Sequence, residues 1–244
     1  MSLENKVILI TGASRGIGRE VAILLSENGA KVVVNYSSSE EEANKTVAHI
    51  TNNGGSAIAV KADVSQRDQV TVLFDKTLAE FGKLDVLINN AGIMDNKFLK
   101  DHTQDDFSKV FEINVRGVFN TLQEAHTKLA DNGIIINFSS STTKLMLPKY
   151  ALYSSTKAAI EQMTRVFANE IGRGISVNAI APGPTATELF NKGKSQETID
   201  QLSSKSAFNR IAEPLDIAKV VLFLANNDSK WISGQVIYAN GAMI

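Results

Sequence analysis

The sequence contains no cysteine, which excludes a disulfide framework and a thiolate metal cluster. Its three histidines, His49, His102 and His126, are scattered and lack metal-ligand spacing, so we predict no metal site. Lys and Arg total 25 against 26 Asp and Glu. Without a basic excess, the chain lacks the electrostatic character of a nucleic-acid-binding protein.

Long apolar runs are missing as well, because no stretch approaches the roughly 20 residues needed to cross a bilayer. The N-terminus, MSLENKVILITG, places an acid ahead of a short apolar run, which is unlike a signal peptide. We therefore predict a cytoplasmic protein with no membrane partner. Apolar residues still make up 43% of the 244 residues, which is enough for a large buried core.

Short β-branched runs alternate with longer segments of helical periodicity. Seven runs are predicted as strands: Lys6–Thr11, Lys31–Asn35, Ala57–Lys61, Asp85–Asn89, Gly133–Phe138, Ile175–Ile180 and Gln235–Tyr238. Several are almost entirely apolar, which is typical of parallel strands covered on both faces. The alternation predicts an α/β fold of the Rossmann type, with one doubly wound parallel sheet flanked by helices on both faces. Residues 1–244 would form a single domain, and Ser39 with Glu42 has the spacing of a capping box that opens the second helix.

A glycine-rich loop follows the first predicted strand, in the order Gly12, Ser14, Arg15, Gly16, Ile17 and Gly18. Glycine allows a tight turn and lets the backbone approach a pyrophosphate closely. The helix after it would offer free N–H groups and a favourable dipole to the same anion. An ordinary strand-to-helix turn is the alternative, but a loop at this place in an alternating chain favours a dinucleotide site.

Tyr153 and Lys157 lie four residues apart at the start of a predicted helix, so both side chains share one face. A free phenol has a pKa near 10, which is too high for efficient acid–base work at neutral pH. We expect the ammonium of Lys157 to lower the pKa of Tyr153. Tyr153 would then donate a proton to a carbonyl that receives a hydride.

These motifs together resemble the short-chain dehydrogenase/reductase family, from Lys6 to Gly241. Three motifs occur in the order found in that family. They are the G-x-x-x-G-x-G loop, which is longer than the G-x-G-x-x-G fingerprint, the N-N-A-G sequence ending at Gly92, and the Y-x-x-x-K pair. The resemblance implies a catalytic tetrad of Asn114, Ser140, Tyr153 and Lys157. Ser140 would orient the substrate oxygen, although a shift to Ser139 or Ser141 stays open.

The resemblance also implies a set of cofactor contacts drawn from the carboxyl ends of the strands. Besides the glycine loop, Tyr153 and Lys157, they are Asn35, Tyr36, Ser37, Ser38, Asp63, Val64, Asn90, Ala91, Gly92, Pro182, Gly183, Thr185 and Thr187. Asp63 and Val64 would contact adenine, and Thr185 with Thr187 would hold the nicotinamide carboxamide. The polar segment 187–206 would form a substrate lid.

The predicted cofactor is NADP(H) rather than NAD(H). NAD enzymes place an acid at the end of the second strand, where it binds the ribose 2′-hydroxyl. Here the sequence after Val34 has no acid before Glu40, and Arg15 supplies a guanidinium that suits a 2′-phosphate. Ser37 and Ser38, which follow this strand, could alternatively be turn residues.

The predicted function is NADPH-dependent reduction of a small-molecule carbonyl to an alcohol. Members of the 3-oxoacyl-[acyl-carrier-protein] reductase type look most similar, and Arg173 matches a basic docking position of theirs. Asp131 and Asn132 stand where another would be. An acyl carrier protein therefore stays open as a partner, beside a sugar, polyol or other alcohol as substrate. The resemblance implies a homotetramer, and a non-catalytic NADP-sensing regulator is the alternative from another class.

Overall fold

The computed structural model describes residues 2–191 and 193–244, which form one layer of strands between two layers of helices. All seven strands pair in parallel, in the order β3-β2-β1-β4-β5-β6-β7. Their bounds are β1 (Val7–Ile10), β2 (Lys31–Tyr36), β3 (Ser56–Lys61), β4 (Val86–Asn89), β5 (Ile134–Phe138), β6 (Ser176–Pro182) and β7 (Val236–Ala239). The strand order reverses between β1 and β4, which is where doubly wound sheets bind ligands.

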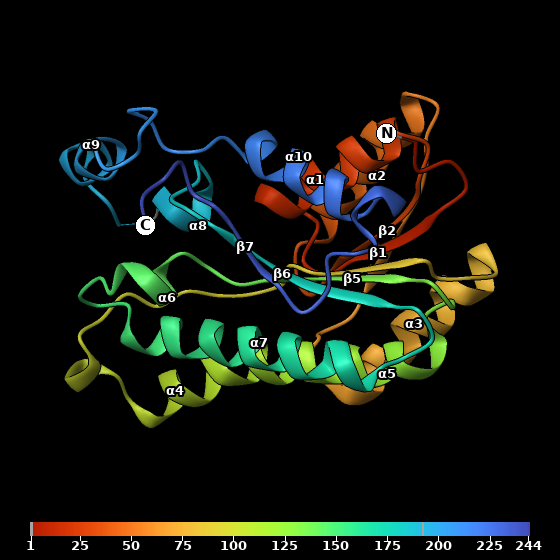
Figure 1. The fold of residues 1–244 in the computed structure, drawn as a ribbon, viewed down its shortest axis with the longest axis horizontal. Helices are drawn as coiled ribbons and strands as arrows, with labels where there is room; N and C mark the ends of the chain where they lie inside the picture. The colour runs from red at the N-terminus through yellow and green to blue at the C-terminus, as the bar shows by residue number, and fades with distance from the viewer. Residues whose placement is uncertain (1, 192) are drawn as a thin grey trace.

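Each face of the sheet is covered by three principal helices (Figure 1). One layer contains α1 (Gly16–Glu27), α2 (Glu40–Asn52) and α10 (Pro214–Leu224). The other contains α3 (Arg67–Phe81), α5 (Gly117–Lys128) and α7 (Ala151–Glu170), and α4 (Gln104–Phe111) continues into α5. The predicted Rossmann-type fold is confirmed.

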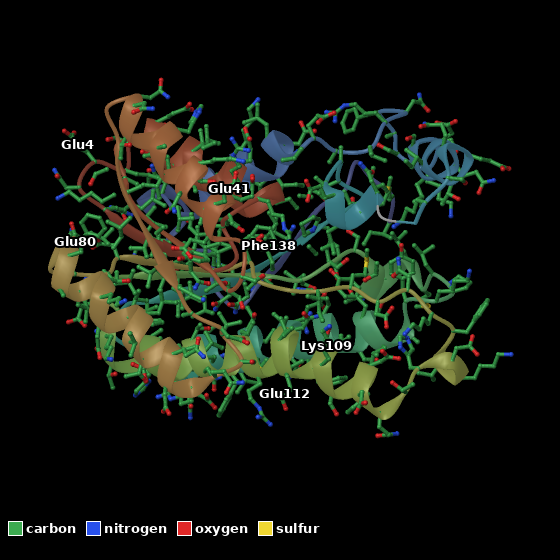
Figure 2. The ribbon with its side chains drawn as sticks, turned by 180° about the vertical axis from the view of Figure 1, so that it is seen from behind. Glu4, Glu41, Glu80, Lys109, Glu112 and Phe138 are labelled. Atoms are coloured by element: carbon green, nitrogen blue, oxygen red, sulfur yellow. The ribbon has the colours of Figure 1, made fainter. Side chains whose placement is uncertain are left out.

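The alternation of side chains along the strands divides the core in two. Ile8 and Ile10 of β1 pack with α1 and α10, whereas Val7 and Leu9 pack with the opposite layer. Figure 2 shows the contrast with the outside, where Glu80 and Glu112 lie at the periphery and Phe138 lies inside. No helix among the described residues has both the length and the apolarity to cross a membrane.

The strand predictions agree with the structure to within two residues at each end. The capping box predicted for Ser39 and Glu42 is wrong. Ser39 is the N-cap residue of α2, but its ψ of 66° is not the extended conformation of a capping residue, and its side chain makes no cap hydrogen bond. Glu42 instead accepts a 2.8 Å hydrogen bond from Lys45.

Short helices lie beyond the carboxyl ends of the strands. They are α6 (Thr142–Leu145), α8 (Glu188–Asn191) and α9 (Gln196–Ser203). The last two belong to the predicted lid at 187–206, of which residue 192 lies outside the described residues. These helices place side chains over the same edge of the sheet as the glycine loop.

Candidate active site

Two glycines of the segment from β1 into α1 have no room for a side chain. Gly12 has a φ of +62°, and a Cβ there would lie 2.9 Å from Ala91 Cα. A Cβ on Gly18 would lie 2.5 Å from Asn90 Nδ2. That same amide nitrogen donates 2.9 Å hydrogen bonds to the carbonyl oxygens of Thr11 and Gly12. The glycine loop and the N-N-A-G turn are thus braced against each other.

The N-terminus of α1 is not capped by a side chain. Arg15 occupies the N-cap position with an extended backbone, and it makes no side-chain cap bond. The first amides of α1 are therefore available to an anion, as in dinucleotide-binding loops. The Arg15 side chain is 63% exposed and pairs with Glu188 at 3.5 Å.

Of the four cofactor contacts predicted at the end of β2, two are buried and two are exposed. Asn35 is fully buried, and its amide bonds the backbone of Gly12, Val60 and Ala62. Tyr36 is also buried. Ser37 and Ser38 are exposed.

Asp63 and Val64 follow β3 and are held by short-range bonds. The Asp63 carboxylate accepts hydrogen bonds from the amide and hydroxyl of Ser65, at 2.9 and 2.8 Å. Val64 is buried against Gly117, where a Cβ would lie 2.6 Å from a Val64 methyl group. Asn120 fixes the Val64 carbonyl oxygen at 2.9 Å. These contacts bring both residues to the carboxyl edge of the sheet.

Three consecutive serines follow β5, and only the middle one has a hydroxyl that makes no bond to the core. Ser139 donates to Glu161 at 2.8 Å, and Ser141 donates to the carbonyl oxygen of Ala181 at 3.1 Å. The Ser140 hydroxyl accepts from the amide and hydroxyl of Thr142 at 3.2 and 3.0 Å. Its own proton makes no bond to the core and lies within reach of Tyr153, whose pKa a hydrogen bond with Ser140 lowers in part.

Asn114 lies in a π-helical turn, Glu112–Arg116, between α4 and α5. It is completely buried. Its amide accepts from the Ile93 amide at 2.8 Å and donates to the Ile93 carbonyl oxygen and to Thr156 at 2.9 and 3.1 Å. The helix is therefore distorted at Asn114, and the asparagine ties that distortion to the loop after β4. π-Bulges of this kind are frequent at functional sites.

Tyr153 and Lys157 share one face of α7, as the spacing predicts. Lys157 is buried and donates a 2.8 Å hydrogen bond to the Phe138 carbonyl oxygen, while its Nζ lies 5.7 Å from the centre of the Tyr153 ring. Burial lowers the pKa of Lys157 to about 8. Burial also raises the pKa of Tyr153 to about 12, although a hydrogen bond with Ser140 lowers it in part.

The predicted lowering of the Tyr153 pKa by Lys157 is therefore wrong. The physical reason is desolvation, which penalises the phenolate more than the neighbouring groups stabilise it. Lys157 is not among the groups that shift this pKa, and its ammonium donates to the Phe138 carbonyl oxygen. A neutral phenol is nevertheless the form that a proton donor requires.

One cavity at the carboxyl edge is lined by predicted residues from five segments of the chain. It is lined by Ser140, Tyr153 and Lys157 together with Ile17, Asn90, Gly92, Pro182, Gly183, Thr185 and Thr187. A Cβ on Gly92 would lie 3.2 Å from Asn114 Oδ1 and 3.5 Å from Lys157 Nζ, so a side chain there would crowd the catalytic groups. The remaining walls are mainly apolar, and they include Leu189, Phe190 and Leu202 of the lid.

A family model described as Enoyl-(Acyl carrier protein) reductase matches residues 12–243. A probable tetrahydroxynaphthalene reductase of Zymoseptoria tritici is 43% identical, with 98% of this chain and 95% of the relative covered. A versicolorin reductase of Emericella nidulans is 42% identical, at 98% and 96% coverage. The chain belongs to the short-chain dehydrogenase/reductase family.

Solved members of the short-chain dehydrogenase/reductase family have the same architecture. A short-chain dehydrogenase of Burkholderia cenocepacia in complex with NADP superposes with a TM-score of 0.94 at 34% identity, covering 100% of this chain and 99% of the other. An angucycline C-6 ketoreductase with bound NADP superposes with a TM-score of 0.93 at 38% identity, covering 99% of this chain and 96% of the other. The present chain is therefore an oxidoreductase by family.

Arg173, which the sequence matched to a carrier-protein docking position, is engaged within the chain. Its guanidinium pairs with Asp131 at 2.7 Å and also bonds the carbonyl oxygens of His126 and Leu129. Asp131, which stands where a second basic docking residue would be, thus forms an ion pair with Arg173. This pairing argues against the carrier-protein interpretation.

The structure also brings together groups that the sequence treated as scattered. Asp95, His102 and Asp106 place ligand-type atoms within 4.8 Å of one another. Lys97 lies at 3.0 Å from Asp95 and 2.9 Å from Asp106, so its ammonium balances both carboxylates. Two further polar groups near the cavity were missed, Glu161 and Tyr150, because their partners come from distant segments.

Proposed function

We propose that this short-chain dehydrogenase/reductase is an NADP(H)-dependent carbonyl reductase that uses Tyr153 as its proton donor. The observation that carries the proposal is the single cavity shared by Ser140, Tyr153 and Lys157 with the glycine loop and the turn after β6. Proximity of these groups to one bound carbonyl is what acid catalysis of hydride transfer requires.

The residues present fit a phosphorylated dinucleotide. Gly12 and Gly18 keep the backbone clear of side chains, and the uncapped N-terminus of α1 offers amides to a pyrophosphate. Arg15, Ser37 and Ser38 are exposed and would hold the 2′-phosphate. When bound, the cofactor supplies the hydride. The names of two solved relatives with NADP support the same choice.

Each catalytic group has a separate task in this proposal. The Ser140 hydroxyl would donate to the carbonyl oxygen in place of its bond with Tyr153, and Tyr153 would transfer its own proton to that oxygen. Lys157 would hold the nicotinamide ribose, and Asn114 would keep the loop after β4 in place. The raised pKa of Tyr153 keeps the phenol protonated at neutral pH, which favours carbonyl reduction over alcohol oxidation.

The cavity walls favour an apolar ketone. Met94, Leu145, Leu147 and Phe190 would bury hydrocarbon, and a sugar or polyol would leave its hydroxyls without partners there. The relatives named after tetrahydroxynaphthalene, versicolorin and angucycline suggest a ketone on or beside a fused ring. A 3-oxoacyl thioester remains the second candidate, since the family model carries an acyl-carrier-protein name.

The test is NADPH oxidation with 2-tetralone and with acetoacetyl-CoA, with NADH run in parallel. We expect turnover of the tetralone with NADPH. Tyr153→Phe should abolish turnover and retain NADPH binding, whereas Tyr238→Phe on β7 serves as a matched control away from the cavity. Wild-type turnover by Tyr153→Phe would overturn the mechanism. NADPH binding without turnover of any carbonyl would instead favour the regulatory alternative.

We also propose a homotetramer in the cytoplasm. An apolar groove crosses α5 and α7, and Phe119 and Val166 within it are 49% and 46% exposed. Large exposed apolar side chains that cluster on one face mark interaction surfaces. Light scattering should give four times the 26.4 kDa chain mass, and Phe119→Glu should reduce that mass. A monomeric wild-type protein would contradict the proposal.

A further inference from the structure

Thr142 lies two positions after the proposed substrate-binding serine and has no part in the proton transfer proposed for Tyr153. It is the first residue of α6, it is half-buried, and it lines the same cavity as Ser140 and Tyr153. Its carbonyl oxygen accepts a 3.2 Å hydrogen bond from the hydroxyl of Ser154, the residue next to Tyr153 on α7. This bond holds Thr142 against the helix that carries the catalytic tyrosine.

The hydroxyl oxygen of Ser140 has two lone pairs, and Thr142 uses both. The backbone amide of Thr142 donates to Ser140 Oγ at 3.2 Å, and the Thr142 hydroxyl donates to the same atom at 3.0 Å. A serine hydroxyl can accept two hydrogen bonds and donate one. With both acceptor positions filled, Ser140 can act only as the donor in its hydrogen bond with Tyr153.

The direction of the bond between Ser140 and Tyr153 matters for proton transfer. If the phenol donated to Ser140, the phenol proton would point away from the substrate, and that bond would have to break before transfer. Because Ser140 donates instead, the phenol proton remains available to a carbonyl oxygen. The partial lowering of the Tyr153 pKa by this bond agrees with that direction, since a donor to the phenol oxygen stabilises the phenolate.

We propose that Thr142 is a positioning residue, whose hydroxyl fixes Ser140 as a hydrogen-bond donor and so keeps the proton of Tyr153 directed at the substrate. This inference rests on the proposed function, because it concerns proton transfer at that same site. The hydroxyl at position 142, rather than the size of the side chain, then determines the rate. Thr142→Val keeps the shape of the side chain and removes the donor.

The experiment measures kcat and KM for 2-tetralone with NADPH in the wild type, in Thr142→Val and in Thr142→Ser. We expect Thr142→Val to lower kcat and kcat/KM together by about tenfold, the size of one good hydrogen bond, with KM nearly unchanged. Thr142→Ser retains the donor and should restore most of kcat. Thr51→Val is the matched control, because the exposed Thr51 hydroxyl donates to carbonyl oxygens within α2.

Two kinetic outcomes would overturn the inference and leave the carbonyl reductase intact. A raised KM at an unchanged kcat would mean that Thr142 shapes the cavity and does not direct a proton. A Ser variant as slow as the Val variant would mean that the hydroxyl is not the group that matters.

The failure of the proposed function would be visible separately, as a wild-type protein that reduces no carbonyl. Fluorine NMR of protein labelled with 3-fluorotyrosine then tests Thr142 without turnover, and the Tyr153 signal is assigned by its absence from Tyr153→Phe. Without the Thr142 hydroxyl, the neutral phenol can donate to Ser140, so Thr142→Val should raise the pKa of Tyr153 by about one. An unchanged pKa of Tyr153 in Thr142→Val would overturn the inference, whether or not a ketone is reduced.

Discussion

The carboxylate of Glu161 accepts a 2.8 Å hydrogen bond from the hydroxyl of Ser139, the residue next to the proposed substrate-binding serine. The same oxygen accepts a second bond of 2.8 Å from Thr143. Glu161 is buried on α7, one turn after Lys157. A single buried carboxylate therefore holds both sides of the turn that presents Ser140.

We predict that Glu161→Ala lowers the free energy of unfolding by about 1–3 kcal/mol, because the buried hydroxyl of Ser139 and the half-buried hydroxyl of Thr143 lose this acceptor. The turn would also loosen, so kcat/KM for a reduced ketone should fall. Glu161→Gln keeps an acceptor oxygen at the same place, and it should restore most of both properties. Urea denaturation and steady-state kinetics measure the two effects. A Gln variant as impaired as the Ala variant would contradict a positioning role.

Gly12 has both a positive φ and no room for a Cβ. Gly54 has a positive φ alone, so it serves as a control for the backbone cost. Gly12→Ala would place a Cβ at 2.9 Å from Ala91 Cα, at a φ of +62°. Gly54 has a φ of +83° with nothing within 4 Å, so Gly54→Ala has only the backbone cost. We expect Gly12→Ala to be less stable than Gly54→Ala by about 1–3 kcal/mol, the usual cost of overpacking. Equal melting temperatures for the two variants would refute the close contact.

Burial of Lys157 should make stability depend on pH in a definite direction. Its pKa falls from 10.5 to about 8 on folding, so between those values the unfolded chain binds more protons than the folded one. The free energy of unfolding therefore rises with pH in that window. Comparison with Lys157→Met separates this residue from the partly buried Lys6, Lys194 and Lys230, whose pKa burial also lowers. The wild-type advantage should grow by on the order of 2 kcal/mol from pH 8 to pH 10, and a constant difference would show that the ammonium is not desolvated.

The fold and the catalytic pair follow from short-range patterns. Strands alternate with helices, parallel strands end at one edge, and Tyr153 and Lys157 are one helical turn apart. These relationships need no knowledge of distant contacts, so the sequence is sufficient for them. The glycine loop is similar, because its turn and its helix are contiguous.

Side-chain roles that depend on distant partners were not predictable in the same way. The amide of Asn35 bonds Gly12, Val60 and Ala62, which come from three segments, so it braces the loop more than it faces a cofactor. The sequence alone left Ser139 and Ser141 open beside Ser140, because only their partners on α7 and β6 distinguish them. Desolvation of Tyr153 likewise depends on the whole fold.

The pairing of Arg15 with Glu188 is another long-range contact, and it bears on cofactor choice. Both side chains are largely exposed, at 63% and 82%, and lie 3.5 Å apart. Exposed pairs of this kind contribute little, about 0–1 kcal/mol, so a 2′-phosphate should displace Glu188 readily. Glu188 belongs to α8 in the lid, and release from Arg15 would accompany phosphate binding.

We therefore predict opposite effects for the two partners on NADPH affinity. Arg15→Ala removes a charge-assisted contact, so the ratio of NADPH to NADH affinity should fall about tenfold or more. Glu188→Gln removes a competitor for the guanidinium, so the same ratio should rise slightly. Cofactor fluorescence titrations give both dissociation constants without any substrate, and added salt should weaken NADPH binding more than NADH binding. If Arg15→Ala weakened NADH and NADPH equally, Arg15 would bind the shared pyrophosphate rather than the 2′-phosphate, and the choice of NADP(H) would then depend on Ser37 and Ser38.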